Sequence, residues 1–140
     1  LAEAQAAAAR GEVPVGAVLV DGQSGTILAR SGNRIEELLD PTAHAELLAI
    51  RAAASHAGAP RLPAADLYVT LEPCAMCAAA ISFARIRRLY FGAYDPKGGG
   101  VEHGSRFFQQ PTCHHAPEVI GGVGESAAAA LLQAFFAARR

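Results

Sequence analysis

The sequence lacks the features that mark membrane-spanning, secreted and disordered proteins. No uninterrupted apolar run approaches the roughly 20 residues that a membrane-spanning helix needs. The first residues, LAEAQAAAAR, have neither the basic start nor the apolar core of a secretion signal. Only three cysteines are present, and an odd number does not suit a secreted disulfide scaffold. With 51% hydrophobic and 18% charged residues, the 140 positions are typical of one globular domain, residues 1–140, in a reducing, cytoplasmic compartment.

Net charge is also scarce. The formal net charge is −1, so the chain as a whole is not typical of a nucleic-acid-binding protein. Arginines nevertheless cluster in the second half, at residues 85–88 and 139–140. A basic face would explain these clusters, but their charge alone favours an ordinary solvated surface.

The pattern of apolar residues predicts alternating helices and strands. In chain order we expect a helix over 1–10, strands over 13–20 and 26–33 joined by a hairpin loop, a helix over 40–58, a strand over 65–72, a helix over 73–85, a strand over 87–94, a glycine-rich loop over 95–105, a short strand within 117–123 and a helix over 125–140. Residues 106–117 show no clear pattern. Strands that alternate with helices need crossover connections, and a hairpin adds an antiparallel pair. The sequence therefore predicts an α/β fold with one mixed sheet and helices on both faces.

The stretch VTLEPCAMC, residues 69–77, raises the question of chemistry. Cys74 and Cys77 lie three residues apart at the predicted N-terminus of a helix, so both thiols face one side of its first turn. The positive end of the helix dipole favours the thiolate, which is the form that binds metal. The spacing alone leaves three interpretations open, namely a redox pair, a pair of buried small side chains and half of a metal site.

His44 and Glu46 make the metal interpretation stronger. They also stand near the predicted start of a helix, and H-x-E followed by P-C-x-x-C is the signature of zinc-dependent deaminases. His44, Cys74 and Cys77 give three ligands, which is the number that a catalytic zinc site takes from the protein. Residues two apart on a helix do not face each other, so Glu46 reaches the site only from the side or if the first turn is irregular.

Cys113, His114 and His115 are rival ligands. A fourth ligand from this segment would close the coordination shell and make the metal structural. The catalytic set is complete without them, so we expect a surface loop with a free thiol here.

At these motifs the sequence resembles the bacterial tRNA adenosine deaminases, which belong to the cytidine deaminase-like superfamily. The resemblance runs over nearly the whole chain and includes EVPVGAVLV, DPTAHAE, LYVTLEPCAMCAAAI, FGAYDPKGG and the closing LLQAFFAARR. It implies a three-layer α/β/α fold, a homodimer, one Zn²⁺ per chain and conversion of the wobble adenosine in a tRNA anticodon loop to inosine.

The resemblance also implies roles for individual residues. It makes His44, Cys74 and Cys77 the zinc ligands and Glu46 the proton shuttle. The residues that would contact the nucleoside or the RNA are Asn33, Asp95, Lys97 and Phe136. From sequence alone, Asn33 is equally well a turn residue, and Asp95 and Lys97 read as a turn. Because adjacent helix positions point about 100° apart, we expect one residue of the Phe135–Phe136 pair to lie in the core.

One segment departs from the family's pattern. GSRFFQQPTCHHAPEV has His114 where the family has an asparagine, and an aromatic pair where the family has aliphatic residues. The departure concerns the substrate rather than the zinc chemistry. Two alternatives therefore remain beside the RNA-editing enzyme: a deaminase of a free base or nucleoside, such as guanine or cytosine, and a non-catalytic module held together by zinc. Basic residues outside the motifs favour the RNA substrate.

Overall fold

The computed structural model describes all residues, 1–140. Its five strands form one sheet in the order β2-β1-β3-β4-β5. The strands are β1 (Gly16–Asp21), β2 (Ile27–Gly32), β3 (Ala65–Leu71), β4 (Arg88–Ala93) and β5 (Glu118–Ile120). β1 pairs antiparallel with β2 and with β3, whereas β3–β4 and β4–β5 are parallel. The predicted mixed sheet is confirmed.

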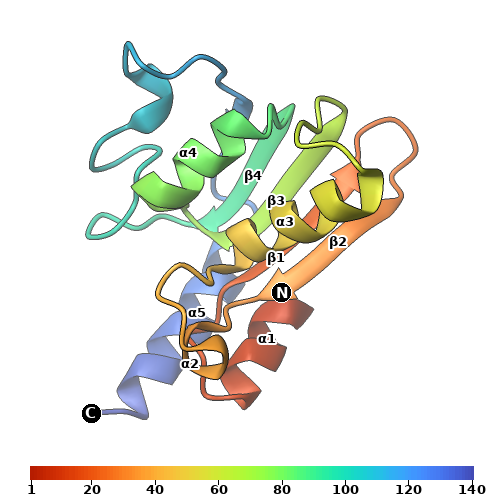
Figure 1. Ribbon diagram of the computed structural model, residues 1–140. Helices are drawn as coiled ribbons and strands as arrows, with labels where there is room; N and C mark the ends of the chain where they lie inside the picture. The colour runs from red at the N-terminus through yellow and green to blue at the C-terminus, as the bar shows by residue number, and fades with distance from the viewer.

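Helices cover both faces of this sheet. They are α1 (Ala2–Ala9), α2 (Ile35–Leu38), α3 (Ala45–Ala57), α4 (Ala75–Phe83) and α5 (Glu125–Ala137), with one 3-10 turn, η1 (Phe107–Gln109). Figure 1 shows α3 and α4 lying across the same face of the sheet. α1 packs on β1 and β2 and α5 packs on β3 and β4, from the other face. None of these helices combines the length and the apolarity needed to cross a membrane.

The alternation of side chains along the strands explains the layers. Ala17 and Leu19 of β1 are fully buried and belong to the core cluster beneath α3 and α4. Gly16, which points the opposite way, faces Glu3 and Ala4 of α1 so closely that a Cβ there would lie 2.5 Å from the Ala4 nitrogen. One face of β1 thus holds the core, and the other receives α1 at a position where only glycine fits.

Several predicted boundaries differ from the structure: β1 begins at Gly16 and not at 13, α5 ends at Ala137, and two helix starts at the site are shifted. The helix expected over 40–58 begins at Ala45, since Asp40 accepts the Thr42 N–H (2.8 Å) in a turn that precedes it. The helix expected over 73–85 begins at Ala75. His44 and Cys74 therefore precede their helices and act as N-cap residues. Both have extended backbone, with φ and ψ of −74° and 149° at His44 and −71° and 174° at Cys74.

Candidate metal centre and active site

The site is built where α3 and α4 begin. β3 ends at Leu71, and the chain turns through Pro73 before α4 starts at Ala75. α3 starts at Ala45, beside α4 on the same face of the sheet (Figure 1). His44 and Cys74 cap these two helices, so the positive ends of both helix dipoles point at the same place. This edge, at the carboxyl end of the parallel strands, is where α/β sheets bind their ligands.

Three candidate ligand atoms converge there. His44 Nδ1 lies 3.6 Å from Cys74 Sγ and 3.5 Å from Cys77 Sγ, and all three atoms lie within 4.8 Å of one another. A tetrahedral zinc ion with Zn–S near 2.3 Å and Zn–N near 2.0–2.1 Å requires N···S separations of about 3.5–3.6 Å. The donor set and the measured separations therefore both fit zinc. Cys77 is fully buried and the other two are partly exposed, which leaves one side of the cluster open.

The charge on this cluster also suits a cation. Hydrogen bonding from Cys77, together with that from His44, lowers the pKa of Cys74 to about 4. Hydrogen bonding to Cys74, together with burial, raises the pKa of Cys77. The hydrogen bond to Cys74 raises the pKa of His44. Without metal the cysteine pair thus holds one thiolate and one thiol, and binding of a metal must release the Cys77 proton.

Glu46 lies in the first turn of α3 and is 4% exposed. Burial raises its pKa to about 7. His44 precedes the helix with extended backbone, so the helical geometry that would separate residues two apart does not apply to this pair. The start of α3 is thus irregular, which is one of the two arrangements that let Glu46 reach the site. A buried carboxyl group with a pKa near neutrality can both accept and donate a proton at physiological pH.

Asn33 lies at the same helix start. It is 6% exposed, and its Oδ1 accepts the Ala45 N–H at 2.8 Å. The side chain thus satisfies one of the first N–H groups of α3, which no cap side chain reaches. Its NH₂ group is left as the donor on that side of the site.

Glu72, which the motif analysis did not single out, is the centre of a hydrogen-bond network. Its side chain is fully buried. Oε1 accepts the Asp95 N–H (3.0 Å) and His103 Nδ1–H (2.8 Å). Oε2 accepts the N–H groups of Val101 (3.2 Å), Glu102 (2.9 Å) and His103 (3.1 Å). Burial alone would raise the pKa of Glu72, but these donors outweigh it and the pKa is lowered.

A second buried carboxylate, that of Glu12, also accepts hydrogen bonds from backbone N–H groups. Glu12 is 3% exposed and accepts the N–H groups of Glu36 (3.1 Å) and Glu37 (2.9 Å). It thereby holds α2, which lies between Asn33 and His44 in the chain. Sequence patterns gave no signal for either carboxylate beyond the presence of an acid beside an apolar run.

The remaining predicted residues are not part of the metal cluster. Asp95 Oδ1 accepts the N–H groups of Lys97 (3.2 Å) and Gly98 (2.9 Å), so Asp95 forms a turn and Lys97 is exposed. Phe136 lies near the end of α5 and is 47% exposed, whereas its neighbour Phe135 is 8% exposed. The prediction that one residue of this pair is in the core is confirmed.

The rival ligands point elsewhere. Cys113 Sγ lies 3.2 Å from the His115 carbonyl and 3.6 Å from Ser82 Oγ. His115 Nε2 bonds to the Ile86 carbonyl at 2.7 Å. The only group of possible ligands that lies close enough for one metal is His44, Cys74 and Cys77.

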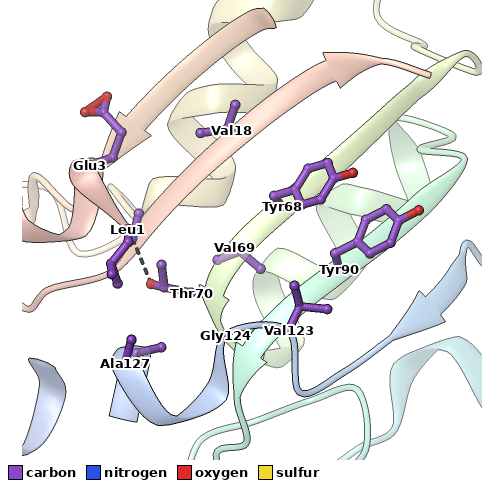
Figure 2. Close-up of a pocket in the computed structure, with 12 residues that line it drawn as sticks. Leu1, Glu3, Val18, Tyr68, Val69, Thr70, Tyr90, Val123, Gly124 and Ala127 are labelled. Atoms are coloured by element: carbon purple, nitrogen blue, oxygen red, sulfur yellow. Dashed lines mark hydrogen bonds between the residues drawn. The ribbon is translucent and has the colours of Figure 1, made fainter. Parts of the chain in front are cut away.

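A hollow of about 220 Å³ lies on the other face of the sheet, between α1 and α5. Figure 2 shows Tyr68 and Tyr90 side by side along β3 and β4 in its wall, with ring centroids 4.4 Å apart and planes at 5°. Its lining is mostly apolar and includes none of the cluster residues. A reactive site needs convergent polar groups, and the metal cluster has them whereas this hollow does not.

The candidate cluster lies within the part of the chain that matches a known protein family. Residues 1–93 match the cytidine and deoxycytidylate deaminase zinc-binding region. The chain is 64% identical over 140 residues to a tRNA-specific adenosine deaminase of Agrobacterium fabrum (strain C58 / ATCC 33970), covering 100% of this chain and 91% of that relative.

Solved structures of deaminases also superpose on this chain. One from a study of A-to-I editing by tRNA:A34 deaminases at the wobble position of transfer RNA superposes with a TM-score of 0.91 at 66% identity, over 94% of each chain. A guanine deaminase from Bacillus subtilis superposes with a TM-score of 0.64 at 31% identity, over 99% of this chain and 87% of that one. The predicted α/β/α deaminase fold is confirmed.

Proposed function

The chain belongs to the cytidine and deoxycytidylate deaminase zinc-binding family, and we propose that it is a zinc-dependent hydrolytic deaminase that converts adenosine to inosine at the wobble position of tRNA. The observation that carries this proposal is the 64% identity to a tRNA-specific adenosine deaminase over all 140 residues. The His44–Cys74–Cys77 cluster beside Glu46 supplies the matching chemistry.

His44 Nδ1, Cys74 Sγ and Cys77 Sγ would hold one zinc ion per chain. Three protein ligands leave a fourth position for water, as in catalytic zinc sites. When bound, zinc supplies a water molecule whose pKa is lowered towards 7 and which is a nucleophile at neutral pH. The two helix N-termini and the Cys74 thiolate prepare this place for a cation and for an incoming polar group.

Glu46 moves the proton. Its carboxylate would take one proton from the attacking water and deliver it to ring nitrogen N1. It would then take the second proton from the new hydroxyl on C6 and deliver it to the amino group, which leaves as ammonia. Its pKa of about 7 suits both directions of transfer. Its burial keeps bulk water from exchanging with that proton.

Asn33 would orient the nucleoside. Its carbonyl oxygen is held by the Ala45 N–H, so its NH₂ group is fixed in direction and can donate to an acceptor on the base or the ribose. A side chain locked by a backbone contact loses little entropy when a ligand binds.

The RNA contacts lie outside the metal motifs. Lys97 is exposed on the loop after β4, and Phe136 is exposed near the end of α5. A lysine binds phosphate and an exposed aromatic ring stacks on an unpaired base, which is how single-stranded loops are gripped. Asp95 would set the shape of the Lys97 turn through its two hydrogen bonds.

Three further proposals concern the protein as a whole. Residues 1–140 would form a single deaminase domain, because one sheet carries all five strands. A tRNA substrate would place the protein in the cytoplasm. A homodimer would cover Phe83 of α4, an apolar side chain that is 68% exposed. A monomer in sedimentation at all concentrations would contradict the dimer.

The function is tested by offering the purified, zinc-loaded protein four substrates: an anticodon stem-loop with an unpaired adenosine, free adenosine, guanine and cytosine. We expect inosine in the stem-loop, little turnover of free adenosine, and activity on the hairpin that falls as salt rises, because phosphate contacts release counterions. Efficient turnover of guanine or cytosine with no inosine in the hairpin would assign the protein to the free-base deaminases instead.

A further inference from the structure

The loop of residues 95–105 contains no strand or helix, yet its middle, residues 99–101, is buried. Its glycines Gly99 and Gly100 are buried, and a Cβ on Gly99 would press against Glu72 Oε2. The five hydrogen bonds that converge on Glu72 come from the two ends of this loop, from Asp95 on one side and from residues 101–103 on the other. A single buried side chain therefore gathers both ends of the loop.

The same loop rests directly on the metal-ligand turn. The Gly100 N–H donates to the Pro73 carbonyl at 2.8 Å, one residue before the ligand Cys74. A Cβ on Gly100 would lie 2.5 Å from the Ala75 nitrogen and 2.9 Å from the Cys74 carbonyl carbon. The Phe107 N–H donates in turn to the Gly100 carbonyl at 2.8 Å. Loop and ligand turn thus share a backbone contact with no side chain between them.

On the basis of the deaminase activity inferred above, we propose that Glu72 is a positioning residue, which holds residues 95–103 against the Cys74–Ala75 turn and so fixes Asp95 and Lys97 relative to the metal centre. It is not one of the three residues of the metal cluster. It acts through the loop, by matching two carboxylate oxygens to five donors. No neutral side chain of the same shape can do this, because an amide presents its own N–H groups to part of the donor set.

Glu72→Gln tests the proposal, and Asp66→Asn is its matched control. Asp66 is also a buried carboxylate, within β3, but it pairs with Arg87 and holds no loop of the site. In Glu72→Gln we expect KM for the anticodon stem-loop to rise roughly tenfold or more, a larger change than any fall in kcat, with zinc content kept. In Asp66→Asn stability falls, but KM stays within about twofold of wild type because no site contact is lost.

Amide hydrogen exchange separates positioning from a purely local loss of bonds, and it needs no activity. The Gly100 and Phe107 N–H groups do not contact Glu72. If Glu72 positions the whole loop, both lose protection in Glu72→Gln and keep it in Asp66→Asn. Retained protection of both, with unchanged KM, overturns the proposal.

A second variant covers the case in which Glu72→Gln does not fold. Gly99→Ala leaves the carboxylate in place but pushes the loop away from Glu72 Oε2. It should raise KM for the stem-loop and expose the Gly100 amide in the same way, and wild-type values in this variant would contradict the proposal. Failure of the wild-type protein to form inosine would reject the deaminase function, while the exchange data would still decide whether Glu72 holds the loop.

Discussion

The contact between Gly100 and the ligand turn leads to a sharp prediction for Gly100→Ala. The new methyl group would lie 2.5 Å from the Ala75 nitrogen and 2.9 Å from the Cys74 carbonyl carbon. Non-bonded carbon contacts are comfortable at about 3.5–4.0 Å, so the loop and the turn must separate by roughly 1 Å. Both partners are backbone, so rotation of a side chain cannot relieve the clash.

The size of the loss in zinc affinity and turnover depends on how far the clash displaces the turn that holds the candidate ligand Cys74. Overpacking of this size costs roughly 1–3 kcal/mol. Metal sites tolerate ligand displacements of only about 0.2 Å. If the turn absorbs the strain, zinc affinity falls by about 10- to 100-fold, since each 1.4 kcal/mol is a factor of ten. A 1 Å displacement near the reacting atoms can also lower kcat/KM by about 100-fold.

The assay is zinc competition with a chelator together with turnover of the stem-loop at saturating zinc. Gly98→Ala is the control, because its Cβ would meet only the Asp95 carboxylate, at 3.0 Å, and no atom of the turn that holds Cys74. We expect a deficit in Gly100→Ala and near-wild-type zinc affinity in Gly98→Ala. Equal zinc affinity and equal turnover in the two variants would refute the reasoning.

Three other predictions concern the metal centre. Cys74→Ser and Cys77→Ser should each lose zinc and activity together, which metal analysis of the purified variants checks; full zinc in both would reject the ligand assignment. Glu46→Gln should keep zinc and the fold but lower kcat by about 10²–10⁴-fold, the usual effect of removing a general acid–base group, and near-wild-type turnover would exclude the shuttle role. Zinc affinity should rise by at least about tenfold per pH unit near neutrality, because the raised pKa of Cys77 keeps its thiol protonated until metal displaces the proton; a pH-independent affinity in calorimetry would contradict the thiol assignment.

Local patterns in the sequence predict most of the fold. The alternation of β1 and β2 around their hairpin, the apolar strands β3 and β4 and the periodicity of α3 and α5 are all properties of neighbouring residues. The short strand β5 is also found within the predicted range, 117–123. The segment 106–117, which has no pattern, forms only the 3-10 turn η1. Regular structure thus follows from period and propensity, which the chain carries locally.

The start of α3 could not be predicted in the same way. Asp40 and Pro41 favour a helix that begins near residue 41, and Asp40 instead closes a turn onto Thr42. The helix begins at Ala45 because its first N–H is bound by Asn33, twelve residues earlier. That bond depends on tertiary structure and leaves no local signature.

The residues of the candidate site also differ in whether a local sequence pattern predicts their role. His44, Glu46, Cys74 and Cys77 form a motif whose chemistry is legible from residue type and spacing. The convergence of the three candidate ligand atoms, on His44, Cys74 and Cys77, agrees with it. Glu72 has no such motif, since its donors lie 23 to 31 residues further along the chain.

The N-caps of α3 and α4 carry a cost in helix stability. A capping side chain that bonds the first N–H groups contributes about 0.5–2 kcal/mol, yet neither His44 nor Cys74 makes such a bond, because both side chains turn to the cluster. The start of α3 recovers part of this from Asn33, and no side chain does the same for α4. The first turn of α4 therefore lacks the side-chain cap that would stabilise it. In metal-free protein we expect this turn to fray before the rest of the fold.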